Sequence, residues 1–316
     1  MKSSIATVSS EASKSSSVAT CAEPPPQRER VWHVHDYDLD STLDCGQAFN
    51  WRRHGDMWRG VVSGRWVELA SRPNEVIARA VESQRDWSWL EEYLQLRVDL
   101  AEVFAEFPAN DPHLEQAIKT CRGMRLLKQD HWECLASFIL SSTKQIVQIQ
   151  QITNLLRSRY GERVKVPNGC GDTFTFPQAE KIVSLTETDL RGCKMGFRAP
   201  YLHDAARKVA SGEVDLKRIA TLPLVDAQAE LMKINGVGEK IAECVLLYGY
   251  GFPTAFPVDV WVARALSEFY FKGRKVALPK LRRFAAKHFG CQAGYAQQYL
   301  FQHIRLREKR MKASET

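Results

Sequence analysis

One lysine and one aspartate in the C-terminal half of the chain have the types and spacing for covalent chemistry. Lys240 ends the run Gly236-Val237-Gly238-Glu239-Lys240, and Asp259 follows Phe256-Pro257-Val258. A lysine amine is a nucleophile only without its proton, and an ordinary pKa of about 10.4 leaves few such molecules at neutral pH. A carboxylate fixed nearby would stabilise positive charge that develops during the reaction. These two residues are the candidate catalytic pair.

A helix, a tight turn and a second helix must carry the lysine. Apolar periodicity predicts one helix over 226–234 and another over 239–249. Between them, Gly236, Val237 and Gly238 form the turn, where glycines can adopt positive φ and expose backbone N–H groups beside a helix N-terminus. Such a turn can bind a DNA phosphate without reading the base sequence. An ordinary helical hairpin with a glycine cap is the alternative interpretation.

Both candidate catalytic residues are predicted at helix starts. In the first turn of its helix, the positive charge of Lys240 is disfavoured by about 0.3–1 kcal/mol. The helix dipole and burial lower the pKa of an amine there, whereas a bound phosphate raises it. The residues alone therefore leave open a nucleophile or a solvated lysine that touches phosphate. Asp259 is a natural N-cap for a predicted helix over 259–271, and a cap can still present one oxygen to a site.

The remaining chain divides into a small β region and a large helical region. From 31 to about 69, aromatic and β-branched runs alternate with glycine turns, which predicts an antiparallel sheet. After residue 74 the apolar spacing shifts toward the 3.6-residue period of a helix, beginning with Val76, Ile77, Ala80 and Val81. This predicts that the rest of the chain is mainly helical. The predicted fold class is α+β, an N-terminal antiparallel β-sheet domain followed by a mainly α-helical body. Further helices are predicted over 87–105, 111–121, 130–142, 144–159, 178–184, 199–211, 279–289 and 293–308.

Four segments are predicted along the chain. Residues 1–30 are rich in Ser and Ala and form a disordered tail, 31–130 form the N-terminal domain, 131–308 form the helical catalytic domain, and 309–316 form a basic C-terminal tail. An organellar targeting peptide is disfavoured for the first segment, because it contains no arginine before Arg28.

Composition narrows the class of protein. The 316 residues are 44% hydrophobic and 26% charged, as in ordinary globular proteins, and a net charge of +7 favours a polyanionic partner such as nucleic acid. The eight cysteines lie far apart, which argues against zinc, against an iron–sulfur cluster and for reduced thiols. The longest uncharged stretch, 244–258, is too short to cross a bilayer. No membrane association, metal or cofactor is expected.

Several motifs together indicate a family. The run from Gly236 to Lys240, followed by Pro257-Val258-Asp259-Val260, resembles the helix-hairpin-helix, Gly/Pro-Asp (HhH-GPD) motif of a superfamily of base-excision DNA glycosylases. Cys45-Gly46-Gln47-Ala48-Phe49-Asn50-Trp51-Arg52 is similar to the N-terminal signature of the 8-oxoguanine DNA glycosylases. Further similarity occurs at 133–142, 196–199 and 295–301. Together these motifs span about residues 31–308.

The resemblance implies a bifunctional enzyme that acts on double-stranded DNA containing an oxidised purine. Lys240 would attack C1′ of a flipped nucleotide, release the base and form an imine that allows β-elimination at the 3′ phosphate. Asp259 would stabilise the cationic sugar. The family also implies a monomer that acts on genomic DNA inside the cell, in the nucleus of a eukaryote or in the cytoplasm and nucleoid of a bacterium.

The same resemblance assigns binding residues. The backbone carbonyl of Gly46 would accept a hydrogen bond from N7–H of 8-oxoguanine, a proton that guanine lacks. Cys244 and Phe301 would sandwich the base, and Gln297 would bond its Watson–Crick edge. The residues expected to contact DNA are Gly236, Val237, Gly238, Trp261, Thr143, Lys144, Phe197 and Arg198.

The chain also departs from the family pattern. Thr143, Lys144 and Gln145 stand where asparagines are typical, Gln148 replaces an arginine, and Trp261 replaces a common histidine. Strict preference for cytosine opposite the lesion is therefore not implied. Two other functions remain open at this point. One is a glycosylase for alkylated or other purines that uses water activated by the aspartate, although such enzymes generally lack the lysine. The other is a non-catalytic DNA-binding module.

Overall fold

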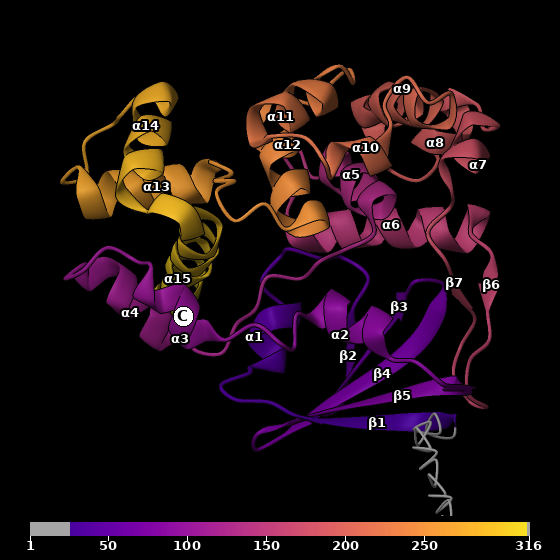
Figure 1. The fold of residues 1–316 in the computed structure, drawn as a ribbon. Helices are drawn as coiled ribbons and strands as arrows, with labels where there is room; N and C mark the ends of the chain where they lie inside the picture. Colours follow the sequence, from indigo (N-terminus) through magenta and orange to yellow (C-terminus); the bar gives the residue numbers. More distant parts are fainter. Residues whose placement is uncertain (1–25, 315–316) are drawn as a thin grey trace, which may run out of the picture.

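A five-stranded antiparallel sheet forms the N-terminal part of the protein (Figure 1). The structure is a computed structural model and describes residues 26–314. Neighbouring strands follow the order β1-β5-β4-β3-β2, and every pair is antiparallel. Their bounds are β1 Gln27–His33, β2 Arg52–His54, β3 Met57–Val62, β4 Arg65–Arg72 and β5 Glu75–Gln84. The α+β fold class predicted from the sequence is confirmed.

Strand β5 corrects the prediction that helices take over after residue 74. It pairs with β1 on one side and β4 on the other, inside the sheet. Val76, Ala78 and Ala80 alternate along the strand and are buried, and Ile77 between them is buried as well. A strand covered on both faces shows a nearly continuous apolar run, which short windows do not distinguish from a helix.

Helices form the rest of the described chain and lie on one side of the sheet (Figure 1). Their bounds are α1 Leu39–Leu43, α2 Ser88–Leu94, α3 Leu100–Ala105, α4 Pro112–Thr120, α5 His131–Leu140, α6 Ile146–Tyr160, α7 Ala179–Val183, α8 Glu187–Arg191, α9 Ala199–Ala210, α10 Leu216–Ile219, α11 Leu224–Met232, α12 Glu239–Val245, α13 Val260–Tyr270, α14 Leu278–His288 and α15 Ala293–Ser314. Short 3₁₀ turns cover Gly196–Arg198 and Gly290–Gln292, and a two-stranded hairpin joins β6 Arg163–Val164 to β7 Thr173–Phe174.

Two of the helices predicted from the sequence differ in extent or type from those in the structure. The segment 87–105 is two helices, because Gln95 adopts a left-handed conformation (φ 54°) after α2. The segment 239–249 begins as α12 and widens into a π-helical turn over Leu246–Tyr250, which ends at Gly251 with φ 76°. Such π turns shift the side chains that follow them and are frequent near functional sites.

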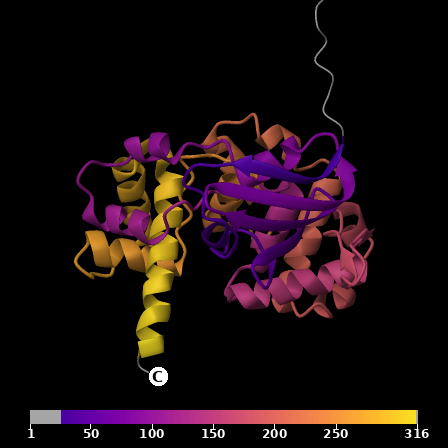
Figure 2. The same cartoon turned by 90° about the horizontal axis from the view of Figure 1, so that it is seen from below.

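The chain ends also differ from the predictions. Residues 1–25 of the expected tail lie outside the described residues, whereas the stretch from Gln27 belongs to β1. At the other end, α15 continues past the predicted end at 308 as far as Ser314, so most of the expected basic tail is helical. Residues 305–312 contain no glycine or proline and are rich in good helix formers, which accounts for the extension. Figure 2 shows these last turns projecting from the body.

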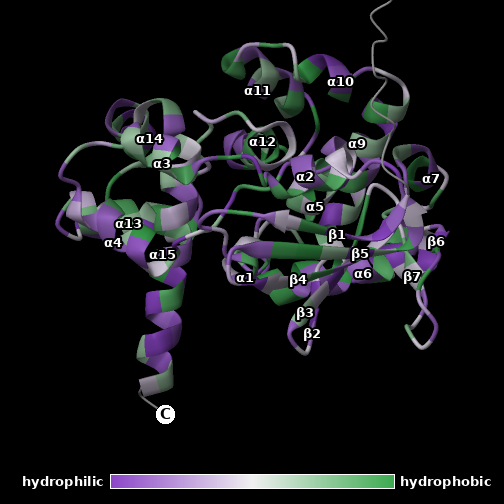
Figure 3. Cartoon of the chain, turned by 60° about the horizontal axis from the view of Figure 1, so that its bottom comes forward, coloured by the Kyte–Doolittle hydropathy of each residue, from purple (hydrophilic) through white to green (hydrophobic). Residues whose placement is uncertain are grey.

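Two large buried clusters and one small one hold the elements together. Of the two large clusters, the smaller packs the sheet against α1 and α2 and the larger fills the helical body, while the small cluster joins β3, β4 and β6. Helix α5 lies at the centre of the larger cluster, and every residue from Cys134 to Leu140 is buried. Figure 3 shows hydrophobic and hydrophilic residues interspersed along the helices of the body, as expected for helices that bury one face. Within residues 26–314, none of the helices combines the length and apolar character required to cross a membrane.

Candidate active site

The turn between α11 and α12 has two glycines with different requirements. Gly236 has φ +82°, and a Cβ atom there would lie 2.6 Å from Cγ of Tyr201, so only glycine fits. Gly238 has φ −96°, caps α12 and has open space around it. Of the two glycines that can adopt positive φ, only Gly236 does so. Val237 between them is buried and anchors the turn to the core.

Lys240 lies in the first turn of α12, as predicted, and points toward the end of α5. Its Nζ lies 3.3 Å from Oγ of Ser141, within hydrogen-bond distance. It also lies 5.6 Å from the centre of the Phe138 ring. The side chain is half-buried, so the amine combines access to a ligand with partial removal from water.

Asp259 is the N-cap of α13, as predicted. Its Oδ1 accepts a hydrogen bond of 2.8 Å from the backbone N–H of Val262. Burial raises the pKa of the carboxyl group above its ordinary value, although that N–H group and the charge of Lys240 act in the opposite direction. The cap fixes the side chain, and the charge of Lys240 stabilises the carboxylate in its partly buried position.

The structure brings the two catalytic candidates into one cavity of about 460 Å³. Both line its wall together with six other residues named from the sequence, namely Gly46, Lys144, Cys244, Trp261, Gln297 and Phe301. A larger cavity of about 690 Å³ lies between β3 and α6, and none of the predicted site residues lines it. The chemistry-bearing side chains therefore identify the smaller cavity as the candidate active site.

Gly46 lies on the cavity wall in a backbone conformation that favours glycine. Its φ is +81°, and a Cβ atom there would lie 2.5 Å from Cδ1 of Ile146. Both the conformation and the space require glycine. The N-terminal signature is thereby brought beside α15, where Gln298 donates a hydrogen bond of 3.3 Å to the carbonyl oxygen of Cys45.

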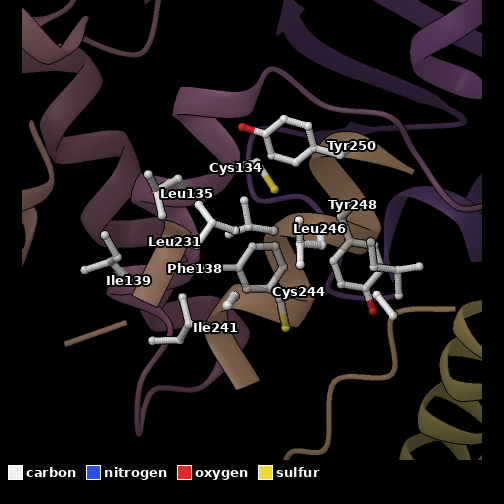
Figure 4. Close-up of a cluster of buried hydrophobic side chains, with 14 of the residues drawn as sticks. Cys134, Leu135, Phe138, Ile139, Leu231, Ile241, Cys244, Leu246, Tyr248 and Tyr250 are labelled. Atoms are coloured by element: carbon white, nitrogen blue, oxygen red, sulfur yellow. The ribbon is translucent and has the colours of Figure 1, made fainter. Parts of the chain in front are cut away.

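The apolar side of the cavity comes from α5, α12 and α15. Burial raises the pKa of the Cys244 thiol to about 12, so at neutral pH it is a protonated, apolar group and not a competing nucleophile. Tyr248 stacks on Phe138 at 5.5 Å, and its hydroxyl, which donates to Oε1 of Gln298 at 2.5 Å, lies 3.2 Å from Oε1 of Gln297. Figure 4 shows Phe138, Cys244 and Tyr248 grouped at one side of the buried cluster. Gln297 is 3% exposed and is thus a buried amide on the cavity wall.

The remaining residues expected to contact DNA lie outside the cavity. Gly236, Val237 and Gly238 form the hairpin turn, while Thr143 and Phe197 are exposed. Arg198 is instead 2% exposed. Its guanidinium donates to the carbonyl oxygen of Ser142 and to Oγ1 of Thr143. In this structure Arg198 supports the turn after α5 from within the protein.

Two known protein families match most of the chain. Residues 31–135 match the N-terminal domain of 8-oxoguanine DNA glycosylase, and residues 136–289 match the HhH-GPD superfamily of base excision DNA repair proteins. The chain belongs to the HhH-GPD superfamily.

Individual relatives of this HhH-GPD protein are named as N-glycosylases and DNA lyases. A probable N-glycosylase/DNA lyase of Methanothermobacter thermautotrophicus is 30% identical over 86% of this chain and 95% of that protein. The Arabidopsis thaliana N-glycosylase/DNA lyase OGG1 is 28% identical over 83% of this chain and 76% of that protein.

Solved structures are similar as well. The Clostridium acetobutylicum 8-oxoguanine glycosylase/lyase, solved with double-stranded DNA containing cytosine opposite 8-oxoguanine, has a TM-score of 0.82 and 32% identity, covering 86% of this chain and 93% of that one. MBOgg1 in complex with a low-affinity DNA ligand has a TM-score of 0.85 and 32% identity, covering 90% and 98%.

Several cavity residues of this HhH-GPD protein were not predicted from the sequence. They are Phe138, Ser141, Ile146, Tyr248 and Arg305. A helical spacing could have indicated Arg305, because Gln297, Phe301 and Arg305 follow one another at intervals of four and share one face of α15. The other four come together only through packing of separate helices, for which local sequence patterns give no signal.

Proposed function

We propose that this HhH-GPD protein is a bifunctional 8-oxoguanine DNA glycosylase and DNA lyase. The observation that carries the proposal is the position of Lys240 and Asp259 on the wall of one cavity that also presents Cys244, Gln297 and Phe301. A nucleophilic amine, a carboxylate and an apolar slot with one buried amide are what base removal from a flipped nucleotide requires. The names of the relatives support the same reaction.

The first reaction step breaks the bond between the base and the sugar. The neutral amine of Lys240 forms a bond to C1′, and the base leaves with the electron pair of the C1′–N9 bond and takes up a proton. The carboxylate of Asp259 stabilises the positive charge that develops on the sugar. Its N-cap hydrogen bond to Val262 holds it in place, so little reorganisation is needed during the step.

The second step cleaves the DNA strand. The nitrogen bound to C1′ loses one of its two protons, and its lone pair then displaces O4′ from C1′. The ring oxygen takes up a proton, and the product is a protonated imine. Loss of a proton from C2′ then sends electrons toward the imine, and the 3′ phosphate leaves by β-elimination. Atoms and charges balance without a metal or a cofactor. The raised pKa of Cys244 supports Lys240 as the nucleophile, because the neighbouring thiol stays protonated.

Base selection depends on the wall opposite the lysine. The carbonyl oxygen of Gly46 would accept a hydrogen bond from N7–H of 8-oxoguanine and would face a lone pair in guanine. Such a mismatch in a buried site costs about 1–3 kcal/mol. Gln297 would bond the Watson–Crick edge, while Cys244 and Phe301 would hold the two faces of the ring.

The DNA backbone would be gripped from the rim of the cavity. The turn at Gly236 and Gly238 offers backbone N–H groups to a phosphate, and Lys144 and Trp261 line the cavity. Phe197 is 54% exposed, which suits an apolar wedge that enters the base stack when the nucleotide leaves it. One chain supplies all of these groups, so we propose that the protein acts as a monomer on genomic DNA within the cell.

Covalent trapping tests the proposed function. Reduction with borohydride during reaction with a duplex containing 8-oxoguanine should link protein and DNA, and Lys240→Gln should abolish the adduct. Lys233→Gln is the matched control, because Lys233 lies on the same hairpin and pairs with Glu230 on the surface. An adduct that persists in Lys240→Gln would contradict the lysine assignment. Base release without strand cleavage would favour a water-dependent purine glycosylase, and binding without base release would favour a DNA-binding module.

A further inference from the structure

Arg305 is a charged residue of the cavity to which neither the reaction nor the predicted base contacts assign a role. It lies on α15, is half-buried and lines the same wall as Gln297 and Phe301. Its guanidinium carbon lies 5.1 Å from the centre of the Phe301 ring. Phe301 is the residue expected to stack on the flipped base. Because Arg305 lies against the Phe301 ring, its guanidinium is also close to the expected position of the base.

Two contacts fix one end of the guanidinium group. Nη1 of Arg305 donates to Oε1 of Gln302 at 2.9 Å and to the carbonyl oxygen of Cys45 at 3.3 Å. The same nitrogen lies 3.7 Å from the position that a Cβ atom on Gly46 would occupy. The guanidinium is therefore next to the backbone segment that would read N7–H of the lesion.

The other end of the group remains available to a ligand. Arginine carries five N–H donors, and in residues 26–314 the hydrogen bonds of Arg305 to protein acceptors all use Nη1. Burial lowers the pKa of Arg305, but a guanidinium starts so high that it keeps its charge at neutral pH. The cavity wall thus contains a charged donor beside an expected carbonyl acceptor.

We propose that Arg305 is a specificity-determining residue that donates a hydrogen bond to O8 of the oxidised purine. The inference rests on the proposed function and extends it to an atom that no other residue has been assigned to read. In 8-oxoguanine, the N7–H donor and the O8 acceptor are adjacent on the ring. The carbonyl of Gly46 and the N–H groups of Arg305 form the complementary pair. Guanine has a lone pair at N7 and a C–H group at C8, so it mismatches the carbonyl and leaves the arginine without its acceptor.

A pair of substrates separates this contact from a structural role. 8-Thioguanine keeps N7–H but replaces O8 with sulfur, which is a weaker acceptor. Single-turnover excision by the unmodified protein should be faster for 8-oxoguanine than for 8-thioguanine. In Arg305→Gln, excision of 8-oxoguanine should fall by about tenfold or more, as expected for a lost charge-assisted hydrogen bond, and the difference between the two substrates should shrink. Arg305→Lys keeps the charge and should retain part of the preference.

Abasic DNA and a control variant complete the test. The ratio of the rate on 8-oxoguanine to the rate of cleavage at an abasic site should fall in Arg305→Gln, because abasic DNA has no base to read. Arg310→Gln removes one exposed positive charge from the same helix and should leave this ratio as it was.

Each other outcome has a definite meaning. Equal losses on 8-oxoguanine and 8-thioguanine would overturn the inference and assign Arg305 to support of the Cys45 segment. Equal losses on damaged and abasic DNA would overturn it in favour of a phosphate contact. If the unmodified protein releases no 8-oxoguanine at all, the proposed function fails first, and the inference fails with it.

Discussion

Nζ of Lys240 lies 3.3 Å from the hydroxyl oxygen of Ser141, across the contact between α12 and the end of α5. Oγ of Ser141 donates its single proton to the carbonyl oxygen of Phe138 at 2.7 Å, so toward the lysine it can only accept. The hydroxyl therefore holds an N–H of the amine and helps to direct the nitrogen lone pair. This orientation depends on the turn after α5, which Arg198 supports from below.

The first prediction concerns this hydroxyl group. Ser141→Ala removes one hydrogen bond to the amine and should lower the single-turnover rate of trapping by about threefold to tenfold, the equivalent of about 0.5–1.5 kcal/mol. Ser142→Ala is the control, because that hydroxyl contacts the carbonyl oxygen of Ile139 at 3.5 Å and not the lysine. Equal rates for the Ser141 variant and the unmodified protein would show that the contact does not orient the amine.

The second prediction concerns the charge of Asp259. Asp259→Asn keeps an N-cap side chain, so the free energy of unfolding at neutral pH should fall by less than about 1 kcal/mol. Loss of the carboxylate should nevertheless slow base excision by about a hundredfold or more, because the positive charge on the sugar is no longer stabilised. Single-turnover excision and denaturant unfolding measure the two effects. Large losses in both would indicate a mainly structural residue.

The pH dependence of the same variant follows from the direction of the pKa shift. Burial raises the pKa of Asp259, so the carboxyl stays protonated to a higher pH than a free aspartic acid and the carboxylate appears as the pH rises through the raised value. The rate of base excision should therefore rise with pH as the carboxylate forms. In Asp259→Asn the rate should no longer show this rise on the acidic side of the pH profile. The folded state binds the Asp259 proton more tightly than the unfolded state does. The free energy of unfolding should therefore fall as the pH rises from the ordinary pKa of an aspartic acid through the raised pKa of the folded state. The variant should remove this dependence from unfolding curves.

The third prediction compares the two glycines of the hairpin. Gly236→Ala requires a left-handed alanine with its Cβ atom 2.6 Å from the Tyr201 ring, and should lower the free energy of unfolding by about 1–3 kcal/mol. Gly238→Ala meets no atom within 4 Å and should lower it by less than about 1 kcal/mol. If a phosphate approaches this turn, Gly238→Ala should still weaken binding to damaged and undamaged duplexes alike. Unchanged binding by Gly238→Ala would place the phosphate elsewhere.

The sequence predicted the hairpin, the helix start at Lys240 and the N-cap at Asp259 because each depends on a few neighbouring residues. Asp259 before an apolar helix is such a local signal, and so are the glycines before Lys240. The sequence did not predict β5, because Val76 and Ile77 are both buried by partners distant along the chain. It also did not predict that Ser141 contacts Lys240 or that Arg305 contacts the carbonyl oxygen of Cys45. These contacts are set by how α5, α12 and α15 pack, and no local periodicity records them.

The final prediction concerns the base opposite the lesion. A side chain that selects one base must offer it a matched set of donors and acceptors, and a good bidentate contact is worth about 1–3 kcal/mol. Arg198 directs its guanidinium to Ser142, Thr143 and the carbonyl oxygen of Met195, and the neighbouring Phe197 has no polar group.

We therefore expect single-turnover excision of 8-oxoguanine opposite cytosine, adenine, guanine and thymine to agree within about tenfold, less than one strong bidentate contact would produce. Arg198→Ala should disturb the turn after α5 and slow all four duplexes together, because the side chain supports that turn and does not read a base. A preference for cytosine of about a hundredfold that disappears in Arg198→Ala would mean instead that the guanidinium leaves Ser142 and Thr143 when DNA binds, and reads the opposite base directly.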